Sequence, residues 1–146
     1  MKIGFIGLGN MGMPMATNLA KSGHEVTGYD LANLSIEGIK IVENLNEVAT
    51  KAELVVTMLP NGEISSSVAS NVLQFMTPGT ILLDCSTIDV KTSREIAEKA
   101  SEKNIWALDG PVSGGVGGAA AGTLTFMVGG SLRAFERVKP IFDIMG

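Results

Sequence analysis

Short apolar runs alternate along the chain with segments whose apolar residues recur at helical spacing. The runs predict strands at residues 2–6, 25–29, 54–59, 80–84, 105–109 and 123–128, with a shorter strand at 39–42. Helical spacing predicts helices over residues 11–22, 45–52, 63–75, 89–103 and 131–145. This alternation is typical of βαβ units. We therefore expect an α/β fold with a doubly wound, mainly parallel sheet and helices on both of its faces.

The turn after the first predicted strand has the pattern G-x-G-x-x-G and opens the first predicted helix. In this context Gly7 allows a sharp turn, Gly9 lets a pyrophosphate approach the backbone, and Gly12 lets the helix pack on the strand. The N–H groups of Asn10 and Met11 then lie at the positive end of the helix. The motif predicts a Rossmann dinucleotide site with contacts from Gly7, Leu8, Gly9, Asn10, Met11 and Gly12. A glycine-rich turn without a ligand is the alternative.

A carboxylate ends the second predicted strand, 18 residues beyond Gly12. At this position Asp30 can accept hydrogen bonds from the ribose hydroxyls and would repel a 2′-phosphate. No arginine follows it, because the next residues are Leu31, Ala32 and Asn33. We therefore expect NAD rather than NADP as the cofactor, while a solvated turn aspartate is the alternative.

Length and charge narrow the possible functions. The 146 residues fit one domain, and 45% of them are hydrophobic. The formal net charge of −4 and the lack of a Lys/Arg run argue against a nucleic-acid partner. No apolar stretch reaches the roughly 18 residues of a membrane span. The single cysteine, Cys85, excludes an internal disulfide and fits the cytoplasm, with a mitochondrial origin left open.

Several residues that could carry chemistry are expected to be structural. His24, the only histidine, lies in a turn between the first helix and the second strand, at the edge away from the strand exits. Cys85 is expected to be a buried thiol without a base, and Trp106 is expected to pack in the core. No His/Cys cluster with metal-ligand spacing is present, so we expect no metal.

Beyond these features, the chain resembles the β-hydroxyacid dehydrogenase family, which includes 3-hydroxyisobutyrate dehydrogenase, over nearly its whole length. The resemblance rests on five blocks of sequence, at residues 4–16, 57–60, 84–89, 109–115 and 123–130. It implies that residues 1–146 are the N-terminal NAD-binding Rossmann domain and that the family's all-α C-terminal domain is missing. We expect the chain to be a fragment of a longer two-domain enzyme, by natural or experimental truncation.

The resemblance also implies roles for individual residues. Dinucleotide contacts are implied for Leu59, Pro60 and Ile64, with core packing as the alternative for Leu59 and Ile64. Thr87 occupies the family's Ser/Thr position near the nicotinamide, where helix capping is the alternative. The turn of Ser113, Gly114 and Gly115 is implied to hold the substrate carboxylate, with a flexible loop as the alternative.

The expected reaction is hydride transfer between NAD and a short β-hydroxy acid, which gives the semialdehyde. In the family the general acid/base is a lysine on a helix after the Rossmann domain, so no catalytic residue is expected in this chain. Lys91, Lys99 and Lys139 are expected to face solvent. An NADPH-dependent semialdehyde or glyoxylate reductase and a non-catalytic dinucleotide-binding module are the alternatives. Apolar surface near the last helix predicts self-association.

Overall fold

The computed structural model describes all residues from 1 to 146. Its main sheet has seven strands: β1 (Lys2–Ile6), β2 (Glu25–Tyr29), β3 (Ile39–Ile41), β4 (Leu54–Thr57), β5 (Ile81–Asp84), β6 (Trp106–Asp109) and β9 (Gly129–Gly130). They lie in the order β3-β2-β1-β4-β5-β6-β9, and every pair is parallel except β6 with β9. The predicted Rossmann-type fold is thereby confirmed.

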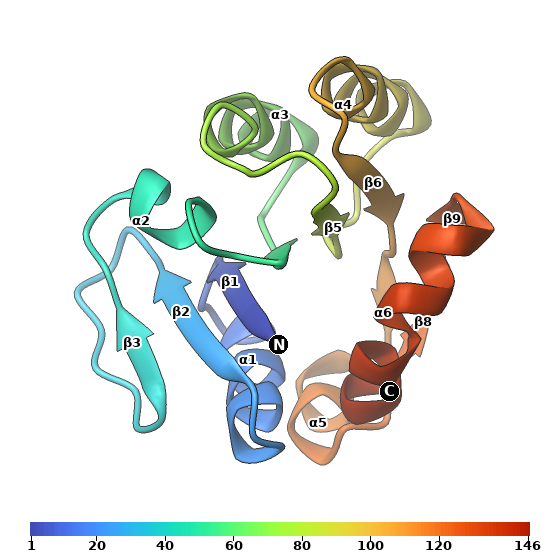
Figure 1. Cartoon of the computed structure of the whole chain (residues 1–146). Coiled ribbons are helices and arrows are strands. Elements are labelled where there is room, and N and C mark those ends of the chain that lie inside the picture. The colour runs from blue at the N-terminus through green and yellow to red at the C-terminus, as the bar shows by residue number, and fades with distance from the viewer.

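Six helices and a small ribbon complete the structure. The helices are α1 (Gly12–Lys21), α2 (Leu45–Ala49), α3 (Gly62–Val72), α4 (Val90–Glu102), α5 (Gly115–Ala121) and α6 (Leu132–Met145). The ribbon pairs β7 (Val112–Ser113) with β8 (Thr125–Phe126) in antiparallel fashion. Figure 1 shows α2, α3 and α4 along one face of the sheet and α1, α5 and α6 along the other.

Each face of the sheet has its own hydrophobic core. Alternate residues of β5 illustrate the division, because Ile81 and Leu83 join the core under α1, α5 and α6 while Leu82 joins the core under α2, α3 and α4. Successive strand residues point to opposite faces, so a strand covered on both faces must be apolar throughout. This explains the continuous apolar runs of the sequence.

The Gly/Ala tract at residues 114–122 contains a helix for which the sequence analysis made no prediction. Residues 115–121 form α5, with Ala119 fully buried and Gly122 in the left-handed conformation that ends the helix. The side chain of Asn18 on α1 donates a hydrogen bond to the carbonyl oxygen of Ala119, at 2.9 Å. Tertiary contacts therefore stabilise a helix whose glycines disfavour it locally.

Two further expectations near β6 were wrong. The single strand predicted at 123–128 is divided, because Thr125–Phe126 pairs with β7 and the chain then continues to β9. Trp106 is not in the core, since it is 36% exposed. It begins β6, whose pairing with the two-residue β9 reaches only Leu108 and Asp109, so no strand residue pairs with Trp106 on that side.

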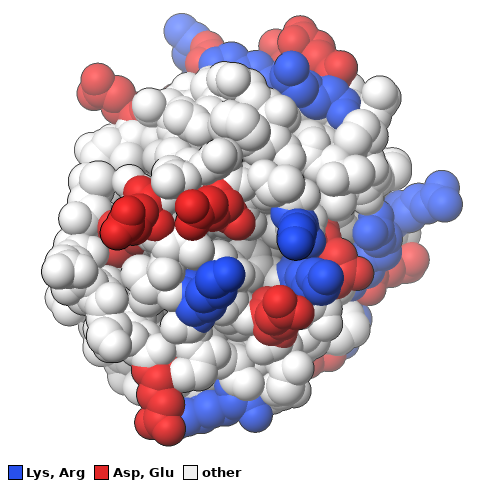
Figure 2. Space-filling view, turned by 60° about the vertical axis from the view of Figure 1, so that its left-hand side comes forward, with Lys and Arg blue, Asp and Glu red and all other residues white.

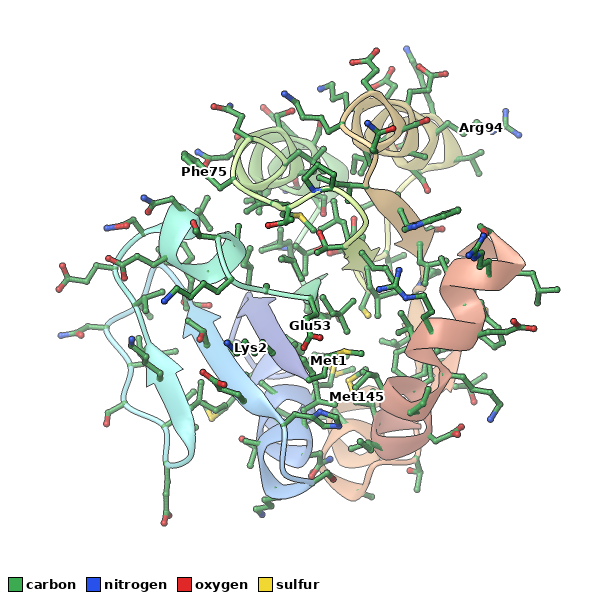
Figure 3. The ribbon with its side chains drawn as sticks, in the orientation of Figure 1. Met1, Lys2, Glu53, Phe75, Arg94 and Met145 are labelled. Atoms are coloured by element: carbon green, nitrogen blue, oxygen red, sulfur yellow. The ribbon has the colours of Figure 1, made fainter.

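The surface beside α2 and β3 carries charges of both signs. Figure 2 shows acidic and basic side chains interspersed there. At the amino ends of the central strands, the backbone N–H of Lys2 donates to a carboxylate oxygen of Glu53, and Figure 3 shows the two residues side by side. None of the helices has the length and apolar character needed to cross a membrane.

Candidate functional site

A cleft of about 570 Å³ opens at the carboxyl ends of β1, β2 and β4. The chain crosses from one side of β1 to the other between β3 and β4, so the strand order reverses here. Such a reversal is where open α/β sheets bind ligands. We call this space the nucleotide cleft; its wall consists of Ile6, Gly7, Gly9, Asn10, Met11, Gly12, Tyr29, Asp30, Leu31, Leu45, Met58, Leu59, Pro60, Ile64 and Val68.

The three motif glycines lie in two different environments. Gly7 has a φ of +96°, and a Cβ atom added to it would overlap the carbonyl oxygen of Met58. A Cβ atom on Gly12 would overlap the carbonyl oxygen of Gly7. A Cβ atom on Gly9 would meet nothing within 4 Å. Gly7 and Gly12 therefore allow close backbone packing, while Gly9 faces open space.

The backbone at this bend presents donors without acceptors. The N–H groups of Gly9, Asn10 and Met11 make no hydrogen bond within the chain, and Met11, the residue before α1, provides no side-chain cap. Unpaired N–H groups at a helix N-terminus form an anion-binding site, because the helix dipole adds positive potential there. The bend therefore has the donors that a pyrophosphate requires.

Asp30 points at the bend rather than into solvent. Its Oδ2 atom accepts a hydrogen bond from the N–H of Leu8 at 2.8 Å, and Oδ1 accepts from the N–H of Ala32 at 2.9 Å. These bonds fix the half-buried carboxylate beside the glycines, at the end of β2. The carboxyl group of Asp30 therefore lies next to the glycine bend.

The predicted residues after β4 also line the nucleotide cleft. Leu59 is half-buried, and its N–H donates to the Oγ atom of Ser86 at 2.8 Å. Pro60 is exposed. Ile64 is 39% exposed in the first turn of α3, which excludes the alternative of core packing for this residue.

Thr87 and the turn from Ser113 to Gly115 lie outside this wall. Thr87 is exposed after β5, and helix α4 is capped by Asp89, whose side chain accepts from the N–H of Thr92 at 3.1 Å. The capping alternative for Thr87 is thus excluded. Ser113 is exposed in β7, and Gly114 and Gly115 follow with φ values of +135° and +65°.

A buried polar network next to these turns was missed by the sequence analysis. Oδ1 of Asp84 accepts hydrogen bonds at 2.9 Å from the Thr57 hydroxyl and from the N–H of Ser86. Ser86 in turn holds Leu59, so the network joins the exits of β4 and β5. The only indication of this network in the sequence was a polar residue, Asp84, at the end of an apolar strand. Cys85 lies between Asp84 and Ser86 in the chain. Its burial, and to a smaller extent the negative charges of Asp84 and Asp109, raise the pKa of the Cys85 thiol well above its usual value.

The residues set aside in the sequence lie away from the nucleotide cleft. The N-terminal amino group lies 3.2 Å from Nδ1 of His24, between the end of α1 and the start of β2. The side chains of Lys91, Lys99 and Lys139 are exposed, as predicted. Lys139 pairs with Asp143 at 2.9 Å, and Lys99 donates to the Ser70 hydroxyl.

Comparison with known families shows which family the chain belongs to. Residues 2–146 match the family described as the NAD binding domain of 6-phosphogluconate dehydrogenase. The chain belongs to this family. The membership covers almost the full length of the chain, including the glycine bend, Asp30 and the turn at Ser113.

Similar proteins place this NAD-binding domain beside 3-hydroxyisobutyrate dehydrogenases. A probable mitochondrial 3-hydroxyisobutyrate dehydrogenase of Dictyostelium discoideum is 47% identical over 99% of this chain and 47% of its own length. An NAD-dependent L-serine dehydrogenase of Pseudomonas aeruginosa is 41% identical, with 99% of this chain and 51% of the relative covered. The resemblance to β-hydroxyacid dehydrogenases is thereby confirmed.

A solved structure gives the same result for the fold. The 3-hydroxyisobutyrate dehydrogenase of Mycobacterium tuberculosis, solved with L-serine, superposes with a TM-score of 0.95 at 41% identity. The match covers 99% of this chain and 52% of that structure. The NAD-binding domain thus spans about half the length of the relatives it matches.

The two glycine environments lead to opposite predictions for the same substitution. Gly12→Ala should lower the free energy of unfolding by about 3 kcal/mol or more, because the new methyl group has only backbone to displace. Gly9→Ala should change it by less than about 0.5 kcal/mol, since the methyl group projects into open space. Urea denaturation of the two variants measures both values. Equal destabilisation by both would contradict this assignment of the glycines.

Proposed function

We propose that the nucleotide cleft binds NAD, with the pyrophosphate on the backbone of residues 9–12 and the adenosine ribose on Asp30. The observation that carries this proposal is the set of three unpaired N–H groups beside an open Gly9. Leu31, Leu45 and Val68 give the cleft an apolar wall that suits the adenine ring. Once bound, NAD supplies the hydride acceptor or donor, and these residues hold and orient it.

The preference for NAD over NADP follows from the charge near the ribose. A 2′-phosphate would bring a second negative group next to the Asp30 carboxylate. No arginine lies among residues 31–33 to neutralise it. The N–H groups of Leu8 and Ala32 hold the carboxylate in place, so it cannot easily turn away.

The reaction we propose is interconversion of a short β-hydroxy acid and its semialdehyde. Both 3-hydroxyisobutyrate and L-serine, named for the relatives, carry a carboxylate and a hydroxyl group on the third carbon. The turn of Ser113, Gly114 and Gly115 would bind the carboxylate through backbone N–H groups and one hydroxyl. Thr87 would contact the nicotinamide end of the cofactor.

We place the general acid/base of this reaction outside residues 1–146. Removal of the hydroxyl proton requires a group within hydrogen-bond reach of the substrate. The lysines considered for this role are exposed on α4 and α6, away from the nucleotide cleft. Residues 1–146 alone are therefore expected to bind NAD with little or no turnover.

Self-association and a cytoplasmic location complete the proposal. Met127, between β8 and β9, and Leu132, the first residue of α6, are 56% and 70% exposed, which supports an apolar contact between two copies. The buried, unpaired Cys85 suits a reducing compartment. Size-exclusion chromatography should show a dimer or larger species, and a monomer at every concentration would refute the contact.

Calorimetric titration with NADH and NADPH tests the cofactor assignment. The wild-type domain should bind NADH at least about tenfold more tightly than NADPH, a difference of roughly 1.4 kcal/mol. Gly9→Ala should weaken NADH binding by about tenfold or more, because its methyl group enters the space assigned to the pyrophosphate. Asp30→Asn should weaken NADH binding and narrow the difference between the two cofactors.

Asp143→Asn serves as the control in this titration, since it removes an exposed carboxylate paired with Lys139 on α6. It should leave both affinities unchanged. Tighter binding of NADPH than NADH by the wild-type domain would overturn the role of Asp30 and favour an NADPH-dependent reductase. Turnover of a β-hydroxy acid by the isolated chain would refute our placement of the acid/base.

A further inference from the structure

Two aspartates at neighbouring strand ends each have an oxygen atom without a hydrogen-bond partner. Asp84 ends β5, Asp109 ends β6, and the two residues are partners in the parallel register. The atoms are Oδ2 of Asp84 and Oδ1 of Asp109, and both are shielded from solvent. Burial of a carboxylate oxygen without a donor is costly, so this pair of atoms needs a physical explanation.

The two carboxyl groups lie on the same face of the sheet. Leu83 and Leu108 precede them and belong to the core under α1, α5 and α6. Because strand side chains alternate, Asp84 and Asp109 point to the opposite face, toward α4. Adjacent strands are about 4.8 Å apart, which brings such neighbours within reach of one another. Both residues line a cavity of about 320 Å³ together with Ser93 of α4.

The surroundings supply no positive charge to balance two carboxylates. Arg94 is the only cation at this cavity, and Figure 3 shows its side chain directed outward from α4. It forms no ion pair with either aspartate, since the one salt bridge of the chain joins Lys139 to Asp143. From the neighbouring strands come Thr57, which is uncharged, the thiol of Cys85, and the glycines of β9.

We propose that Asp84 and Asp109 share one proton, which Asp109 donates from its Oδ1 atom to Oδ2 of Asp84. A single proton then provides partners for both unpaired oxygens. Two carboxylates at one site rarely ionise together, because the second charge is repelled by the first. Burial, followed by the charge of Asp84, raises the pKa of Asp109, while the Ser93 hydroxyl acts in the opposite direction.

The shared proton makes Asp109 a positioning residue for the two turns beyond it. Thr87 follows Asp84 closely in the chain, after Cys85 and Ser86. The turn that contains Ser113 begins directly after Asp109. The N–H of Gly110 also donates to the carbonyl oxygen of Asp84, at 2.8 Å. The proton thus ties together the exits assigned to the nicotinamide end and to the substrate carboxylate. This functional consequence rests on the proposed function, whereas the proton itself does not.

Carbon-13 NMR of the aspartate carboxyl groups tests the shared proton directly. In a pH titration of the whole chain, the carboxyl signal of Asp109 should titrate above the usual pH range of an aspartate. Asp84→Asn should bring the titration of Asp109 to lower pH, because it removes the like charge. Titration of Asp109 within the usual pH range of an exposed aspartate in the wild-type protein would overturn the proposal.

The pH dependence of stability provides a second test that needs no cofactor. A pKa of Asp109 raised in the folded state means that the folded protein binds the proton more tightly than the unfolded chain. The free energy of unfolding should therefore fall as pH rises through the folded-state pKa. Asp109→Asn keeps a hydrogen-bond donor for Asp84 but cannot titrate. This variant should therefore show a smaller fall in the free energy of unfolding with rising pH, whereas Asp143→Asn should show the same fall as the wild-type protein.

An unchanged pH dependence in Asp109→Asn would contradict the shared proton. Because both measurements are made without NAD, their failure is distinguishable from a failure of the cofactor assignment. If the proton is confirmed and the calorimetry fails, the aspartate pair remains a feature of the fold and only its link to the substrate turn is lost.

Discussion

At the first bend of the chain, the backbone of β1 passes so close to β4 and to the start of α1 that neither Gly7 nor Gly12 has room for a Cβ atom. This close packing allows the helix to begin directly at the sheet edge. The N–H groups that follow, beside the open Gly9, are left without acceptors. These N–H groups, together with the helix dipole, favour an anionic ligand, which can approach the backbone where side chains are absent. The nucleotide cleft depends on this constraint.

Polar contacts extend from the cleft along the carboxyl edge of the sheet. Asp30 is tied to the bend through the N–H of Leu8. Further along the edge, the Oγ atom of Ser86 accepts a hydrogen bond from the N–H of Leu59. The N–H of Ser86 in turn donates to the carboxylate of Asp84. The exits of β1 and β2 are therefore joined by one half-buried hydrogen bond, and those of β4 and β5 by buried and half-buried hydrogen bonds. An ordered edge of this kind can orient a cofactor relative to a substrate turn.

The sequence predicted what depends on local pattern and missed what depends on tertiary partners. The central strands are apolar on both faces, so their runs were readable, and the glycine bend was recognised from its spacing after a strand. Helix α5 was missed because its Gly/Ala composition does not favour a helix without the contacts of Ala119 and Asn18. Trp106 was wrongly predicted to be in the core because it lies in an apolar run. Its exposure results from the shortness of β9, which does not extend alongside Trp106, and the sequence gives no sign of this.

The candidate site also has a part that the sequence predicted and a part that it did not. The bend, Asp30 and the exit of β4 meet in one cleft, as parallel strand ends must. The pairing of Asp84 with Asp109 could not be predicted, because it requires the strand order and the register of β5 with β6. Single aspartates in a sequence do not reveal which oxygen atoms remain unpaired after folding.

The most direct test of this account is a titration of the nitrogen-15-labelled domain with NADH, followed by amide NMR. We predict that the N–H signals of Gly9, Asn10 and Met11 shift the most, because these groups gain the acceptors they lack. The signals of Lys2 and Glu53, at the opposite edge of the sheet, should not move. Unshifted signals at residues 9–11 under saturating NADH, or the largest shifts at that opposite edge, would contradict the account.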